Sequence, residues 1–210
     1  MTMKVMLIIK NPNDKILKEV AKQLRAGAVV VYPTDTAYGL GCDATNAKAV
    51  AKIFKIKGRD AKKALPMIVT DTKMAKKFFL FATCYVPFAK RHWPGPLSIV
   101  LQAKNGIVKA ALKKGTAAVR VPDSLIARAL SKYLGRPLIA TSANVSHQPT
   151  CYSVKAYLTQ VGRNHAPRAT RHEPDIVLDA GALRRRRPST IVKVKDNGEV
   201  EVLRRGPVKI

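Results

Sequence analysis

Short apolar runs rich in β-branched residues alternate along this chain with segments that carry apolar residues at helical spacing. The run 28–32 (AVVVY) ends at Pro33, and its continuous apolar character is typical of a strand buried on both faces. Apolar residues recur at helical spacing in 13–27, which begins with a potential capping asparagine and ends at a glycine. This alternation predicts an α/β fold, in which a twisted, mixed β-sheet is flanked by helices.

The rest of the chain continues this pattern. We expect further strands at 65–69, 97–101, 117–121, 138–141, 176–178, 190–194 and 199–203. We expect further helices to begin near Asn46, Asp123-Ser124 and Ser153, and amphipathic segments at 73–81 and 85–91. The polar, glycine-containing segment 34–41 is expected to be a turn, and Asp196-Asn197-Gly198 is expected to join the last two strands as a hairpin.

The charge of the chain is strongly unbalanced. It has 39 Lys and Arg against 13 Asp and Glu, a formal net charge of +26. A field of this sign attracts polyanions such as nucleotides, nucleic acid or an anionic membrane surface. A general solubility surface is the alternative explanation, because charge alone does not say which anion binds. The length of 210 residues and the 47% hydrophobic content suit one domain, 1–210, with a substantial core.

The cysteines and the apolar segments indicate the compartment. Cys42, Cys84 and Cys151 are far apart and form no C-x-x-C motif, which suits a reducing cytosol. The apolar run 5–9 is too short for a signal peptide, and no stretch approaches the roughly 18–20 apolar residues of a membrane helix. We therefore expect a cytoplasmic protein without a membrane span. The four histidines show no metal-ligand spacing with the cysteines, so we expect no protein-bound metal.

Two tripeptides suggest an anion-binding site. Lys57-Gly58-Arg59 places a point charge and a planar guanidinium around a glycine that lets the backbone approach a phosphate. Ser142-Ala143-Asn144 follows a predicted buried strand and offers a hydroxyl and an amide to a phosphate or a ribose. Each tripeptide alone is equally compatible with an ordinary turn. No Walker A, G-x-S-x-G or G-x-G-x-x-G sequence occurs, so P-loop, hydrolase and Rossmann interpretations lack support.

Other polar residues stand at strand ends or inside strands. Thr34-Asp35-Thr36 follows a strand end, where α/β proteins keep ligands, although a simple Asx or Ser/Thr turn is an equal alternative. Arg120 lies inside the apolar run AAVRV and needs an anionic partner, either a ligand carboxylate or an internal acid. Ser189-Thr190 begins a strand just after Arg184–Arg187, which is either a solvated face or a contact for RNA phosphates.

Taken in order, these segments resemble the YrdC-type threonylcarbamoyl-AMP synthases. The matching stretches are VVVYPTDTAYGLGCDA (29–44), IFKIKGR (53–59), LPMIV (65–69), WPGPLSIVL (93–101), AVRVPD (118–123), PLIATSANVS (137–146), PSTIV (188–192) and LRRGPV (203–208). Each motif alone is modest, but eight in the same order cover nearly the whole chain. The resemblance implies a twisted mixed sheet flanked by helices, with an open electropositive cavity on one side.

The resemblance also implies an activity. Such enzymes form threonylcarbamoyl-AMP and pyrophosphate from L-threonine, bicarbonate or CO2, and ATP, with Mg2+ as the expected companion of the phosphates. The product feeds N6-threonylcarbamoyl modification of adenosine 37 in tRNA, which a separate transferase complex completes. The expected partners are therefore these substrates, that downstream complex, and tRNA or double-stranded RNA.

Residue roles follow from the matched motifs. The resemblance implies that the ATP ligands are Lys57, Arg59, Thr116, Ser142, Asn144, Thr150 and Arg204. It implies that L-threonine is held by Thr34, Arg120 and Ser189, with Arg120 on the carboxylate. No covalent nucleophile or dedicated general base is apparent, so we expect catalysis by positioning and electrostatics.

Some positions depart from the family pattern. Asp60 and Ala64 replace frequent prolines, Ile68 stands where some members have a threonine-contacting histidine, and His147 replaces a frequent glycine. We expect altered contacts at the rim of the site. The end at Ile210 resembles the short form of the family, without the additional C-terminal domain of longer members.

Two other functions compete with the synthase. The first is a non-catalytic RNA-binding protein of the same fold, suggested by the net charge of +26. Only 6% of the residues are aromatic, and none are interleaved with the basic clusters to stack on bases. The second is a carbamoyl-transfer domain of the hydrogenase-maturation type, which normally occurs with further domains.

Overall fold

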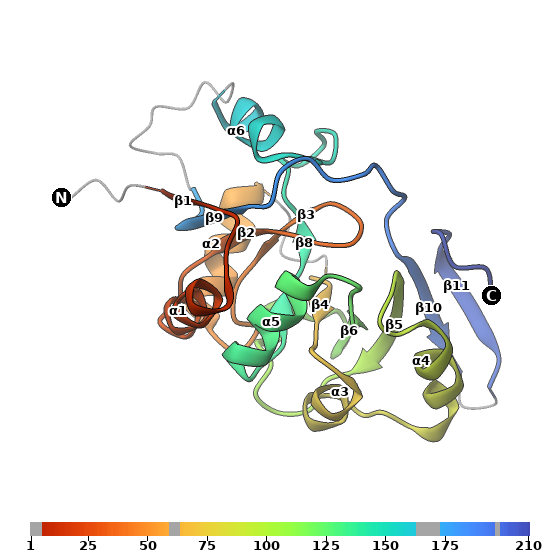
Figure 1. Cartoon of the computed structure of the whole chain (residues 1–210). Coiled ribbons are helices and arrows are strands. Elements are labelled where there is room, and N and C mark those ends of the chain that lie inside the picture. Colours follow the sequence, from red (N-terminus) through yellow and green to blue (C-terminus); the bar gives the residue numbers. More distant parts are fainter. Residues whose placement is uncertain (1–5, 59–63, 163–172, 196–197) are drawn as a thin grey trace.

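The computed structural model describes residues 6–58, 64–162, 173–195 and 198–210, and it confirms a mixed α/β fold (Figure 1). The described strands form two mixed sheets. In spatial order, the first sheet contains β1 (Leu7–Lys10), β9 (Ile176–Asp179), β2 (Val30–Pro33), β3 (Tyr38–Gly41) and β8 (Thr141–Ser142). The second contains β11 (Val200–Arg204), β10 (Thr190–Val194), β5 (Leu97–Gln102), β6 (Thr116–Arg120), β4 (Met67–Ile68) and β7 (Leu138–Ile139).

In the described part of the chain, six α-helices connect and cover these strands. They are α1 (Asp14–Arg25), α2 (Ala47–Lys57), α3 (Thr72–Phe78), α4 (Val86–His92), α5 (Leu125–Leu134) and α6 (Val154–Gly162), with short 3-10 turns at Thr83–Tyr85 and Lys109–Ala111. Figure 1 shows α1 and α5 side by side on one flank, and the two elements are in contact. Within the described residues, none of these helices is long and apolar enough to cross a membrane.

The sheets combine parallel and antiparallel pairs. In the first, β9 runs parallel to both β1 and β2, and β3 lies antiparallel between β2 and β8. In the second, β5 is parallel to β10 and antiparallel to β6, while β11 pairs antiparallel with β10. The predicted hairpin strands are therefore confirmed, although Asp196 and Asn197 of its turn lie outside the described residues.

The predicted helix starts are confirmed by their capping bonds. Asn13, Asn46 and Ser124 each accept a hydrogen bond from the backbone N–H three residues later, at 3.0, 3.0 and 3.3 Å. Ser153 makes the same bond at the start of α6, over 3.1 Å. Gly135 ends α5 with φ 73°, a left-handed conformation that glycine adopts without steric cost. These signals depend on neighbouring residues alone, which is why the sequence predicts them.

The continuous apolar run of β2 has a clear structural reason. Val30 and Tyr32 are fully buried in the cluster that contains the leucines of α1 and α5. Val31 points the other way, into a second cluster to which both sheets contribute. A strand in the middle of the molecule thus has apolar partners on both faces.

The expectation of a turn over 34–41 is wrong in its second half, where β3 begins at Tyr38. Glycine usually weakens a strand, so the sequence Gly39-Leu40-Gly41 does not predict the strand that it forms. At Gly41, however, a Cβ atom would lie 2.2 Å from the carbonyl oxygen of Ile139. Glycine therefore permits the close approach of the neighbouring backbone. Two further differences are β1, which was not expected, and the division of 138–141 between β7 and β8.

Candidate active site

A cavity of about 440 Å³ lies where the two sheets meet. The first sheet contributes Tyr38 and Gly39 of β3 and Thr141 and Ser142 of β8. The second sheet contributes residues of β4, β5, β6, β10 and β11. A space of this size, with both polar and apolar walls, is typical of a site for a small molecule.

The charged residues along this cavity are cationic. They are Lys113, Arg120, Arg186 and Arg204. None of the described residues that line the cavity is acidic. Burial, and then the nearby charge of Arg120, lower the pKa of the Arg204 guanidinium. Cations held close together in this way favour an anionic ligand that neutralises them.

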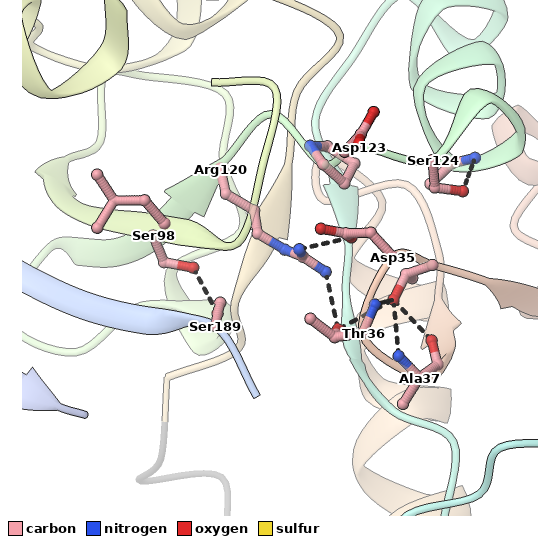
Figure 2. A network of polar contacts seen from close by, with 12 residues as sticks. Asp35, Thr36, Ala37, Ser98, Arg120, Asp123, Ser124 and Ser189 are labelled. Atoms are coloured by element: carbon pink, nitrogen blue, oxygen red, sulfur yellow. Dashed lines mark hydrogen bonds and ion pairs between the residues drawn. The ribbon is translucent and has the colours of Figure 1, made fainter. Parts of the chain in front are cut away.

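Arg120 has the internal acidic partner that its position in an apolar strand requires. Its NH1 donates to Asp35 Oδ1 over 2.7 Å, and its NH2 donates to Thr36 Oγ1 over 3.3 Å. The side chains of Arg120 and Asp35 are only 9% and 3% exposed. Figure 2 shows the guanidinium held from one side by these two residues of the turn after β2. Of the two alternatives for Arg120, the internal acid is therefore present, and the residue still lines the cavity.

The hydroxyl of Thr34 closes the turn that carries Asp35. Thr34 Oγ1 donates to the carbonyl of Ala37 over 2.6 Å and accepts hydrogen bonds from the backbone N–H groups of Thr36 and Ala37, both at 3.2 Å. This is a Ser/Thr turn of the kind that the sequence left open. It fixes the backbone that presents Asp35 and Thr36 to Arg120. The Thr36 hydroxyl lies 3.1 Å from that of Thr34.

Ser189 lies across the cavity from this turn, just before β10. Its Oγ is 2.9 Å from the Oγ of Ser98 on β5 (Figure 2). Arg204 on β11 donates through Nε to the Ser189 carbonyl and through NH2 to the Ser189 hydroxyl, both at 2.9 Å. The register of three neighbouring strands thereby brings together residues that are far apart in the sequence.

Lys57 fixes the Ser142–Asn144 turn through hydrogen bonds from its ammonium group. Its ammonium donates to the carbonyl oxygens of Ser142 (2.7 Å) and Asn144 (3.1 Å) and to Asn144 Oδ1 (2.9 Å). Ser142 Oγ also donates to Asn144 Oδ1 over 2.6 Å. Lys57 is 4% exposed, and Gly58 directly after it ends α2 with φ 56°. The two predicted tripeptides therefore meet through this lysine.

The structure brings most of the predicted site residues to one cavity. Those that line it are Thr34, Thr116, Arg120, Ser142, Thr150, Ser189 and Arg204. Lys57 and Asn144 are not among the lining residues. Lys57 instead donates hydrogen bonds to Ser142, which lines the cavity, and to Asn144. Arg59 and Asp60 lie outside the described residues.

The departures from the family motifs have distinct positions. Ile68 is fully buried in the core cluster of α1 and α5 and is not among the residues that line the cavity. His147 has φ 67°, a left-handed conformation that favours glycine. Ala64 lines the cavity.

Two residues of this site are not singled out by the sequence. Ser98 contacts the predicted residue Ser189, and Lys113 lines the cavity as a cation, whereas Asp35 and Arg186 belong to segments that the sequence marks. Ser98 is a polar residue inside the apolar run LSIVL, the same signal that drew attention to Arg120. Nothing in the local sequence marks Lys113, because its position depends on how β6 begins.

The described residues contain no group of three or more His, Cys, Asp and Glu side chains that could hold a metal ion. This part of the chain therefore does not supply the carboxylate-rich cage in which proteins usually bind a divalent cation directly.

The chain is thus a mixed α/β protein with a cavity between two sheets, and the charged residues that line this cavity are cationic. Residues 22–206 match the model of the Sua5/YciO/YrdC family, which is described as "Telomere recombination". The chain belongs to this family.

Three relatives illustrate the similarity. The threonylcarbamoyl-AMP synthase of Vibrio vulnificus (strain YJ016) is 32% identical over 196 residues, which cover 90% of this chain and 98% of that protein. The crystal structure of P. abyssi Sua5 complexed with L-threonine superposes with a TM-score of 0.81 at 28% identity. E. coli YciO, at 23% identity and a TM-score of 0.81, has the same fold over 99% of this chain and 98% of its own.

The relatives differ in length. The match covers 96% of this chain but 57% of the P. abyssi Sua5 chain. This chain therefore spans little more than half of that protein.

Proposed function

We propose that this protein is a threonylcarbamoyl-AMP synthase, which converts L-threonine, bicarbonate or CO2, and ATP into threonylcarbamoyl-AMP and pyrophosphate. The observation that carries the proposal is the single cavity that collects Thr34, Thr116, Arg120, Ser142, Thr150, Ser189 and Arg204 from distant segments. The names of the relatives support it, as does the L-threonine bound to P. abyssi Sua5. The reaction class is nucleotidyl transfer, because an adenylyl group passes from ATP to a carbamate oxygen.

L-Threonine would occupy the part of the cavity near Arg120 and Ser189. Asp35 and Thr36 hold the Arg120 guanidinium from one side, which leaves its remaining N–H groups for a carboxylate. Ser189 supplies a hydroxyl from the opposite wall. This arrangement fixes an amino acid by its polar ends, so that its amine reacts from a defined position.

ATP would occupy the part near Ser142, Thr116 and Thr150, as the motifs predict. The cations Lys113, Arg186 and Arg204 along the cavity would stabilise the negative charge of the phosphates. Lys57 would act from behind by holding the Ser142–Asn144 turn in shape. Mg2+ enters this proposal as a companion of the ATP phosphates, because this ion is usually held by substrate phosphates with one or two carboxylates.

The chemistry then needs positioning more than a reactive side chain. The amine of threonine takes up CO2 and loses a proton to become a carbamate. A carbamate oxygen attacks the α-phosphorus of ATP, and the bond to the departing pyrophosphate breaks in line. The cationic walls stabilise the charge that moves onto the pyrophosphate.

Pyrophosphate release from ATP and bicarbonate, with and without L-threonine, tests the proposal. We expect release that depends on threonine. Release that is absent, or equal without threonine, rejects the synthase.

The product would supply the tRNA modification through a separate transferase complex, and tRNA or double-stranded RNA is a proposed partner. RNA binding that survives saturating ATP and threonine would favour a separate RNA surface. The candidates are the exposed Arg184, Arg185 and Arg187 of the Arg184–Arg187 run, since Arg186 lines the cavity.

A further inference from the structure

A buried serine, Ser98, contacts Ser189, one of the residues proposed to bind L-threonine. Ser98 belongs to the apolar run LSIVL of strand β5 and is 2% exposed, yet it lines the cavity. Its Oγ lies 2.9 Å from the Oγ of Ser189, which is 6% exposed (Figure 2). A hydroxyl in such a position requires a hydrogen-bond partner, and Ser189 is that partner.

The direction of this hydrogen bond follows from the third member of the group. Arg204 NH2 donates to Ser189 Oγ over 2.9 Å, and a guanidinium has no acceptor atom. The Ser189 oxygen therefore accepts from Arg204. Its second lone pair and its one hydrogen are left for Ser98 and for the cavity.

Two arrangements of the hydrogens are available. If Ser98 donates to Ser189, the hydrogen of Ser189 is free to point toward a ligand. If Ser189 donates to Ser98, the buried hydrogen of Ser98 needs another acceptor, and no other hydrogen bond of this hydroxyl occurs among the described residues. The first arrangement leaves no buried donor unsatisfied, so it is favoured.

We propose that Ser98 is a positioning residue that makes Ser189 a hydrogen-bond donor to an oxygen atom of bound L-threonine. The proposal rests on the function given above, because it names threonine as the ligand. Arg204 and Ser98 together fill both lone pairs of Ser189, and the Ser189 O–H then has one direction left, toward the substrate. Ser98 acts through Ser189 and does not itself contact the substrate.

The backbone around the two serines is held without their side chains. Thr190 N donates to the carbonyl of Pro96 over 2.9 Å, and the strands pair in register from Thr190 with Leu97 to Val192 with Ile99. Removal of the Ser98 hydroxyl therefore leaves the strand pairing intact. A change in ligand affinity can then be attributed to the loss of the hydroxyl.

The test measures L-threonine binding by calorimetry to the whole chain and to three single variants of Ser98. Ser98→Ala and Ser98→Val both lack the hydroxyl, whereas Ser98→Thr retains it and is nearly the same shape as the valine variant. We expect the alanine and valine variants to bind threonine roughly five- to tenfold more weakly, as the loss of one oriented hydrogen bond implies. Ser98→Thr should restore the wild-type affinity, and ATP affinity should change in none of them.

A double variant separates positioning from direct contact. If Ser98 acts only through Ser189, Ser98→Ala/Ser189→Ala should bind threonine no more weakly than Ser189→Ala alone. The proposal is overturned if the folded Ser98→Ala or Ser98→Val variant binds threonine as the wild type does, or if Ser98→Thr fails to restore binding. It is also overturned if the losses of affinity from Ser98→Ala and Ser189→Ala simply add in the double variant. A wild-type chain that binds no L-threonine overturns the proposed function and this proposal together, whereas threonine binding that ignores Ser98 overturns this proposal alone.

Discussion

The guanidinium of Arg120 donates to the carboxylate of Asp35 over 2.7 Å, and both side chains are almost fully buried beside the cavity. Because the two residues lie on different elements, their contact joins the turn after β2 of the first sheet to the end of β6 in the second. Asp35 thus fixes the direction in which Arg120 presents its remaining N–H groups. Removal of one partner of a buried pair leaves an uncompensated charge, which makes this contact a sensitive test of the site.

Asp35→Asn should weaken both the fold and the binding of L-threonine. The asparagine keeps the shape but leaves the buried Arg120 charge unpaired, so we expect a loss of about 3–5 kcal/mol in the free energy of unfolding. Urea unfolding and threonine calorimetry measure the two effects. Asp123→Asn is the matched control, because Asp123 is 70% exposed and its contact with Arg128 is 3.5 Å. An Asp35→Asn variant with wild-type stability and affinity would contradict the role given to this pair.

Lys57→Ala should raise the KM for ATP and reduce stability at the same time. The change removes the charged donor to three part-buried oxygens of the Ser142–Asn144 turn, and loss of a hydrogen bond to a charged group costs about 1.5–3 kcal/mol. Lys55→Ala, an exposed position on the same helix, should change neither quantity. A Lys57→Ala variant that loses ATP affinity with no change in the unfolding midpoint would contradict this role, since that pattern indicates direct phosphate contact only.

Gly41→Ala should destabilise the chain, because the new methyl group would lie 2.2 Å from the Ile139 carbonyl oxygen and 2.8 Å from the Tyr32 ring. We expect a loss of about 1–3 kcal/mol, typical of overpacking. Gly162→Ala serves as the control, since nothing lies within 4 Å of its added methyl group. Chemical denaturation measures both variants. Equal stability of the two alanine variants would mean that β3 and β7 do not approach as closely as described.

The stability of the chain should fall in alkali partly through Cys151. Burial raises the pKa of this thiol from 9.0 to about 11, although the charge of Lys57 opposes the shift. The folded state therefore holds its proton more tightly than the unfolded state. The contribution of Cys151 is complete below about pH 9 and is lost as the pH rises to about 11.

Unfolding free energies of wild type and Cys151→Ala between pH 7 and pH 11 test this point. The difference between the two should be constant up to about pH 8 and should shrink from pH 9 to pH 11. Tyrosines such as Tyr38, whose pKa burial raises to about 12, contribute equally to both proteins and cancel. A difference that stays constant over the whole range would contradict the raised pKa of Cys151.

The sequence predicts local features well and tertiary contacts poorly. Asn13, Asn46 and Ser124 are visible as caps because each bonds to a backbone group three residues away. The need of Arg120 for an anionic partner is also visible, but its partner is not, because Asp35 is 85 residues away and reaches it only when the two sheets meet.

The same limit applies to β3 and to the cavity. The two glycines of β3 look like turn residues until Gly41 is seen against Ile139, a contact between residues on different strands. The roles of Ser98 and Lys113 likewise depend on the residues from other strands that line the same cavity. The motifs in order predicted the family, which is confirmed over residues 22–206, while the substrate roles of individual residues stay predictions.

Direct detection of the product tests the central proposal most closely. The wild-type chain would be incubated with ATP, Mg2+, bicarbonate and isotopically labelled L-threonine, and the nucleotides separated and weighed by mass spectrometry. We predict a labelled threonylcarbamoyl-AMP that requires all three substrates and that decreases strongly in Arg120→Ala. Labelled threonine that enters no nucleotide, with a folded chain that binds both ATP and threonine, would contradict the synthase.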